Sequence, residues 1–123
     1  MPRRKDRPLR VADLFCGAGG FSEGFSQAGF EIAYALDNWG PACETHLHNH
    51  PSTETVKGDI LDIEPSTLPE IDMLIGSPPC SEFSYAKKGG KGDISLGMKL
   101  VERFLDFVIE LRPRYWIMEN VPR

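Results

Sequence analysis

The chain has 123 residues, enough for one hydrophobic core and too few for two. Its composition, 41% hydrophobic and 26% charged, excludes a disordered chain and predicts one soluble globular domain or part of one. The net charge of −4 is unevenly spread, because residues 11–123 hold nine basic and seventeen acidic residues, a net charge of −8. Nucleic-acid phosphates are normally bound by clustered Lys and Arg. If nucleic acid is the partner, most of the binding energy must come from groups outside this acidic part of the chain.

The cysteine, histidine and apolar patterns narrow the class of protein further. Cys16, Cys43 and Cys80 form no C-x-x-C pair, which disfavours a disulfide scaffold or a zinc ribbon and favours a reducing compartment. Three histidines alternate between residues 46 and 50, a spacing that does not share a helical face, so no metal site is predicted. No apolar run approaches the roughly 18 residues of a membrane span. We therefore expect a cytoplasmic or nucleoid-associated protein.

Short apolar runs alternate with amphipathic stretches of helical length, which predicts βαβ units and a parallel sheet in an α/β fold. Residues 1–10 are expected to be a basic tail before a domain that occupies residues 11–123. The Gly- and Lys-rich stretch Phe83–Gly97 is expected to be an irregular loop. Strands are predicted at Leu9–Phe15, Ile32–Leu36, Thr53–Val56, Ile71–Ile75 and Tyr115–Met118, and helices at Phe21–Ala28, Pro41–Asn49 and Leu100–Leu111.

Polar or glycine-rich residues follow each predicted strand, where a parallel sheet binds its ligands. The loop Gly17–Gly20 lets a ligand approach the backbone and opens a helix N-terminus. A dinucleotide fingerprint would need glycine where Ser22 stands, which weakens a pyrophosphate reading. Asp37, twenty residues after the first glycine of the loop, fits hydrogen bonds to ribose hydroxyls. Together these features favour an adenosine ligand.

Cys80 and Glu119 are the candidate reactive pair. Two prolines before Cys80 hold its thiol at a strand end, whereas the other two cysteines fit buried small side chains better. One crossover helix joins the fourth and fifth predicted strands, so Cys80 and Glu119 are expected at adjacent strand ends. A carboxylate raises the pKa of a neighbouring thiol and activates it poorly. The pair makes chemical sense if the carboxyl group protonates a pyrimidine nitrogen while the thiolate attacks the ring.

Three segments resemble the first, fourth and sixth motifs of the DNA (cytosine-5) methyltransferases: DLFCGAGGF at 13–21, GSPPCSEFS at 76–84 and ENV at 119–121. The resemblance covers residues 11–123. It implies a Rossmann-like S-adenosylmethionine-dependent methyltransferase fold, mostly parallel and incomplete at about five strands. By the same resemblance, the cofactor of the protein would be S-adenosylmethionine and its substrate would be double-stranded DNA with a flipped-out cytosine. A role in restriction-modification is expected from it.

The resemblance also implies a role for each site residue. Cys80 would attack C6 of the flipped cytosine, Glu119 would contact N3 and the exocyclic amine, methyl transfer to C5 would follow, and elimination would release the enzyme. Asp37 would bind the cofactor's ribose and Asp59 its adenine. The implied cofactor contacts are Phe15, Gly17, Ala18, Gly19, Gly20, Asp37, Asn38, Asp59, Ile60, Pro79 and Leu100, and the implied DNA-closing loop holds Ser84, Lys87, Lys88 and Lys91.

The chain departs from the family pattern at several positions. Ser81 stands where the family usually has Gln, and Asn38 where an aromatic residue often follows the ribose-binding acid, with Trp39 one place later. No Q-x-R-x-R arginine motif or target-recognition region is present, so we expect a second chain or a C-terminal part to carry them. Without it, the chain should be weakly active or inactive, with an exposed sheet edge beyond its last strand.

Three alternative functions remain open from the sequence. The chain could be a cofactor-binding regulatory subunit without turnover, although such a subunit needs neither Cys80 nor Glu119. It could methylate tRNA, which one branch of the same family does. It could also be a nicotinamide-dependent oxidoreductase, a hypothesis that rests only on the glycine loop and Asp37.

Overall fold

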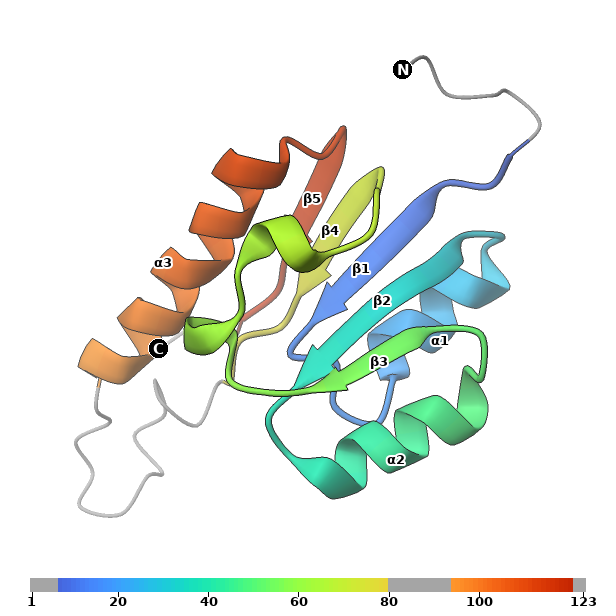
Figure 1. The fold of residues 1–123 in the computed structure, drawn as a ribbon, viewed down its shortest axis with the longest axis horizontal. Helices are drawn as coiled ribbons and strands as arrows, with labels where there is room; N and C mark the ends of the chain where they lie inside the picture. Colours follow the sequence, from blue (N-terminus) through green and yellow to red (C-terminus); the bar gives the residue numbers. More distant parts are fainter. Residues whose placement is uncertain (1–6, 80–93, 121–123) are drawn as a thin grey trace.

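One all-parallel sheet organises the part of the chain that the computed structural model describes, residues 7–79 and 94–120 (Figure 1). Its strands are β1 (Arg10–Leu14), β2 (Glu31–Asp37), β3 (Glu54–Lys57), β4 (Met73–Gly76) and β5 (Tyr115–Met118). Their order is β3-β2-β1-β4-β5. The first three strands are added toward one edge of the sheet and the last two toward the other edge, so the strand order reverses between β1 and β4. The predicted five-stranded Rossmann-like α/β fold is confirmed, and its ligand site is expected at that reversal.

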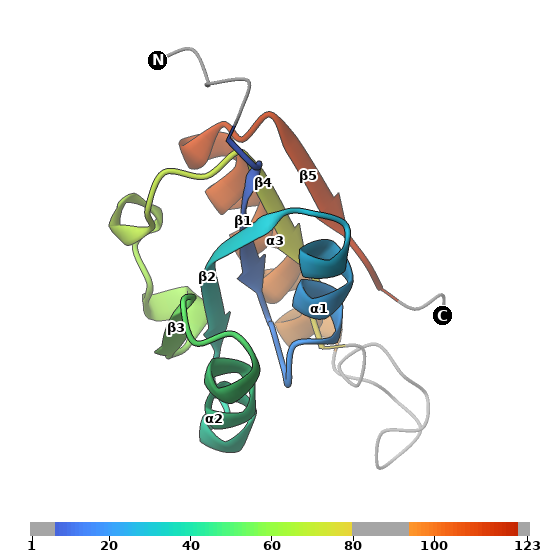
Figure 2. The same ribbon diagram turned by 90° about the vertical axis from the view of Figure 1, so that its right-hand side faces the viewer.

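Helices cover both faces of the sheet, and Figures 1 and 2 give two views of them. On one face α1 (Gly20–Gln27) packs beside α2 (Gly40–Asn49), and on the other lies α3 (Ile94–Leu111) with the short 3-10 turns η1 (Ile60–Asp62) and η2 (Pro65–Thr67). The alternation of helices and strands along the chain agrees with the βαβ pattern expected from the sequence. No helix in the described ranges is long and apolar enough to cross a membrane.

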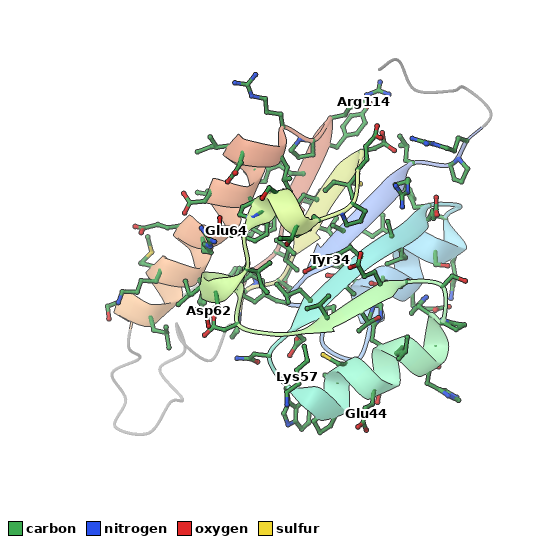
Figure 3. The ribbon with its side chains drawn as sticks, viewed as in Figure 1. Tyr34, Glu44, Lys57, Asp62, Glu64 and Arg114 are labelled. Carbon is green, nitrogen blue, oxygen red and sulfur yellow. The ribbon has the colours of Figure 1, made fainter. Side chains whose placement is uncertain are left out.

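The strand side chains alternate between two apolar clusters, one on each face of the sheet. Tyr34 in β2 belongs to the cluster beneath α3 and is 2% exposed, and burial raises the pKa of its hydroxyl to about 12 (Figure 3). The buried members of that cluster are Ala12, Leu14, Tyr34, Leu36, Ile60, Leu68, Leu74, Phe104 and Phe107, and those of the α1 face are Val11, Ile32, Met73 and Ile75.

The structure corrects the start of the long helix. α3 begins at Ile94 and not at Leu100, so the predicted loop Phe83–Gly97 is wrong for its last four residues, and the rest of it lies outside the described residues. Gly97 is buried three positions before Leu100, on the face that packs against the sheet. Burial of this face offsets the roughly 1 kcal/mol that a glycine costs inside a helix.

β5 has its predicted bounds and α2 ends at its predicted residue, whereas the remaining ends of the helices and strands other than α3 differ from their predicted positions by one or two residues. β1 stops at Leu14 because Phe15 turns into the left-handed region, with φ of 60°. At its other end β1 includes Arg10, the last residue of the expected basic tail. The backbone amide of Arg10 donates to Asp72 at 2.8 Å, and its guanidinium donates to the carbonyl of Glu70 at 2.8 Å. These bonds tie the start of β1 to the segment that leads into β4.

Gly76, the last residue of β4, is a position where a side chain has no room. A Cβ there would lie 2.5 Å from Cε2 of Phe104 and 3.3 Å from the carbonyl oxygen of Leu14. We expect Gly76→Ala to lower the free energy of unfolding by about 2 kcal/mol, because α3 must shift away from the sheet. Urea denaturation measures the change. Gly24→Ala in α1, where a Cβ meets nothing within 4 Å, is the matched control and should raise stability by about 0.5 kcal/mol.

Candidate functional site

The glycine loop leaves β1 through a sharply turned backbone. Phe15, Gly17 and Gly19 all have positive φ, at 60°, 54° and 105°. The amide of Gly17 donates to Oδ2 of Asp37 at 2.8 Å, and the amide of Cys16 donates to the carbonyl of Leu36 at 2.9 Å. The loop is therefore fastened to the carboxyl end of β2, next to the acid that the sequence singles out.

Asp37 is held in place by two backbone amides. Its Oδ2 accepts the hydrogen bond from Gly17, and its Oδ1 accepts one from the amide of Trp39 at 2.9 Å. Each carboxylate oxygen can accept a further hydrogen bond, so the group remains able to bind two hydroxyl donors. Asp59 is fixed in a similar way, since its Oδ1 accepts from the amide of Leu61 at 2.9 Å. Both acids are acceptors with defined directions.

A pocket with a cavity volume of about 220 Å³ lies at the carboxyl ends of the strands. Seven of the eleven residues that the sequence assigned to the cofactor line it. The lining residues are Phe15, Leu36, Asp37, Asn38, Gly58, Asp59, Ile60, Ser77, Pro79 and Leu100. The pocket thus combines two carboxylates with apolar walls from both sides of the strand reversal.

The remaining four residues that the resemblance assigns to the cofactor lie elsewhere. Gly17, Ala18, Gly19 and Gly20 do not line this pocket, and the last three border a separate groove beside the C-terminal end of α2. Gly17 contributes to the first pocket indirectly, because its amide donates a hydrogen bond to the lining residue Asp37.

Three lining residues were not foreseen from the sequence. Leu36 and Gly58 each directly precede a predicted acid, so the strand-end pattern could have included them. Ser77 sits inside the fourth motif without a role assigned to it.

Glu119 lies at the end of β5, where the sequence placed it. β4 and β5 pair in parallel, and the amide of Glu119 donates to the carbonyl of Gly76 at 2.9 Å, which confirms that the two strand ends are adjacent. The Ser77 hydroxyl donates to Oε2 of Glu119 at 2.5 Å. Glu119 also lines a second pocket, which it shares with Phe15, Cys16, Phe21 and Ser77.

Cys80, the other residue of the predicted reactive pair, lies outside the described residues. Cys80 and Ser81 follow directly after Pro79, which lines the first pocket. The predicted DNA-closing loop is outside them as well; its residues are Ser84, Lys87, Lys88 and Lys91.

The other two cysteines are unsuited to nucleophilic attack. Cys16 and Cys43 are both buried free thiols, as predicted. Burial, with Asp13 and Asp37 nearby, raises the pKa of the Cys16 thiol far above its usual range. Burial and the charge of Asp37 also raise the pKa of Cys43. Since the thiolate is the reactive form, neither side chain suits the nucleophilic role that the sequence predicts for Cys80.

The hydrogen-bond acceptors and apolar walls of the first pocket fit S-adenosylmethionine. Asp37 can accept from ribose hydroxyls, Asp59 can accept from an adenine amine through Oδ2, and apolar side chains such as Ile60 can contact the base. No Lys or Arg stands among the described lining residues, so nothing there would neutralise a pyrophosphate. This disfavours a nicotinamide dinucleotide. Among residues 7–79 and 94–120, no group of three or more His, Cys, Asp or Glu could hold a metal ion.

Solved structures share this fold. A putative DNA modification methyltransferase encoded within a prophage (E. coli) is 33% identical, with a TM-score of 0.77, and the alignment covers 93% of this chain and 32% of that one. Dnmt2 of S. pombe is 22% identical with a TM-score of 0.70, and the alignment covers 94% of this chain and 35% of that one. The second likeness concerns the fold alone.

Sequence comparison identifies the family. The type II methyltransferase M.HgiGI of Herpetosiphon aurantiacus is 42% identical over 121 residues, and M.HgiDI of the same organism is 43% identical. M.AgeI of Thalassovita gelatinovora is 37% identical. The alignments cover 92–94% of this chain, but 92% of M.HgiGI, 38% of M.HgiDI and 28% of M.AgeI. The C-5 cytosine-specific DNA methylase family matches residues 9–123, and the chain belongs to that family.

Proposed function

We propose that the chain binds S-adenosylmethionine and supplies the nucleophile for methylation of cytosine C5 in double-stranded DNA. The observation that carries the proposal is the contact between the two pockets. Phe15 and Ser77 line both, so a ligand held at Asp37 adjoins the space beside Glu119. Family membership and the type II methyltransferase relatives support the same chemistry.

In this proposal each residue has a defined task. Asp37 and Asp59 orient the cofactor, which supplies an electrophilic methyl group. Cys80 forms a bond from its sulfur to C6 of the cytosine, while Glu119 gives a proton to N3. C5 would then take the methyl group as the bond from that methyl to the cofactor's sulfonium sulfur breaks, which leaves S-adenosylhomocysteine. Transfer of the C5 proton to water would break the bond from C6 to Cys80, restore the ring and return Cys80 to its thiolate form. The proton returns to Glu119 when N3 is released.

Ser77 gives Glu119 its orientation. Because the hydroxyl occupies Oε2, the other carboxyl oxygen is left to face the base. This arrangement explains how an exposed side chain at a strand end can serve as an acid with a defined direction.

We also propose that further polypeptide, from the same or a second chain, continues the sheet beside β5 and supplies the DNA-recognition surface. β5 is an edge strand of the described sheet, and Tyr115, Trp116 and Ile117 are 51%, 47% and 42% exposed. Large apolar side chains on an open edge favour a protein partner.

Two experiments test the proposed function. In calorimetry, the chain should bind S-adenosylmethionine with a Kd at least about 100-fold below that for NAD, because the described lining residues of the pocket offer acceptors for ribose and no cation for phosphate. Failure to bind S-adenosylmethionine would reject the proposal.

The second experiment tests the covalent step. This chain replaces the matching part of M.HgiDI, and the chimera is incubated with S-adenosylmethionine and DNA that contains 5-fluorocytosine. A covalent protein–DNA adduct is expected on a denaturing gel and should be absent with Cys80→Ser. Cys43→Ser, in a buried cysteine of α2, is the matched control and should keep the adduct. Binding without an adduct would favour the regulatory-subunit alternative.

A further inference from the structure

Three buried polar side chains form a hydrogen-bonded chain beneath the glycine loop. Asp13, Ser22 and His46 are 1%, 0% and 0% exposed and come from β1, α1 and α2. The Ser22 hydroxyl donates to Oδ2 of Asp13 at 2.5 Å, and Nε2 of His46 lies 2.9 Å from the same hydroxyl. None of the three lines either pocket described above. The proposed function therefore leaves this cluster without a task.

The first of these bonds closes the loop at its base. Asp13 precedes the loop in β1 and Ser22 follows it in the first turn of α1, so their hydrogen bond joins the two ends of residues 14–21. Within this stretch, Phe15 is a non-glycine residue at a φ of 60°, a conformation that persists only where its surroundings impose it. Closing the base of the loop is one such constraint.

His46 supports the loop from below. A Cβ on Gly19 would lie 2.9 Å from Cδ2 of His46, so the imidazole ring lies directly against the glycine backbone. The same ring is hydrogen-bonded to Ser22. Burial, and then His50, lowers the pKa of His46, which keeps the ring neutral. A neutral ring with its proton on Nε2 donates to Ser22, whose hydroxyl donates in turn to Asp13.

We propose that Asp13, Ser22 and His46 are positioning residues that hold the glycine loop in its cofactor-binding shape. They act through Phe15, which lines the cofactor pocket, and through Gly17, whose amide fixes the Asp37 carboxylate. The inference rests on the proposed binding of S-adenosylmethionine and assigns to this chain's own residues a role at that site. A loosened loop would free Gly17 from Asp37 and weaken binding without unfolding the protein.

Replacement of His46 tests this positioning role in the full chain. His46→Phe keeps a ring against Gly19 but removes the bond to Ser22, and should raise the Kd for S-adenosylmethionine about 10-fold. His46→Gln keeps an N–H near the position of Nε2 and should bind within about 3-fold of wild type. His48→Phe, at an exposed position of the same helix, is the matched control and should bind like wild type. Calorimetry well below the melting temperature gives the Kd values.

A second measurement needs no cofactor. Hydrogen exchange of the Gly17 amide should be about 10-fold faster in His46→Phe than in wild type or His46→Gln, because its bond to Asp37 opens more often. Ser22→Ala repeats both tests if His46→Phe does not fold. Equal Kd values and equal exchange in wild type and a folded variant would overturn the positioning role. No cofactor binding by wild type, with the exchange difference intact, would instead overturn the proposed function and leave the loop restraint in place.

Discussion

The Asp13→Asn variant should gain stability relative to the wild-type chain as the pH rises from about 4 to about 8, by about 4 kcal/mol in total. Asp13 is 1% exposed, and burial raises its pKa from 3.8 to about 7, although the hydrogen bond from Ser22 opposes the increase. Between these two pKa values, the native state binds a proton that the unfolded chain releases. The Asp13 contribution to stability is therefore fully present below about pH 4 and is lost as the pH rises to about 7. Asn has no proton to lose.

The measurement is the difference in the free energy of unfolding between the variant and wild type, from urea titrations at several pH values. His46 acts in the opposite direction, since its lowered pKa costs stability as the pH falls below about 6.5, but it is present in both proteins. Ser52→Ala, at an exposed position without a group that titrates in this pH range, is the control and should differ from wild type by a constant amount. A constant difference for Asp13→Asn as well would contradict burial as the cause of its raised pKa.

Strand positions could be predicted from the sequence because each strand is an apolar run bounded by turn residues. β5 was predicted with its observed bounds, and the single crossover helix before it made its pairing with β4 predictable. The start of α3 could not be predicted, because Gly97 reads locally as a helix breaker. Only its burial against the sheet shows that it continues the helix.

Two hydrogen bonds between residues far apart in the sequence could not be predicted either. Ser77 and Glu119 are 42 residues apart, and Ser22 and His46 are 24 residues apart, so no local pattern connects them. Ser22 was noticed in the sequence only as a departure from the dinucleotide fingerprint. In the structure the same position holds α1 against β1, a task that glycine performs in the fingerprint by allowing close packing. The departure thus replaces close packing with a buried hydrogen bond.

Asp37→Ala should raise the Kd for S-adenosylmethionine about 100-fold, or abolish measurable binding. The carboxylate can accept from two ribose hydroxyls, and hydrogen bonds to a charged group contribute about 1.5–3 kcal/mol each. Alanine also leaves the amides of Gly17 and Trp39 without their acceptor, so the loop loses its attachment to β2. Asp37→Asn retains one oxygen acceptor and should fall between alanine and wild type, at about 10-fold. Calorimetry gives all three values. Asp62→Ala, outside the pocket lining, should bind like wild type. If Asp37→Ala bound S-adenosylmethionine as wild type does, the ribose, and with it the cofactor, would not bind at the end of β2.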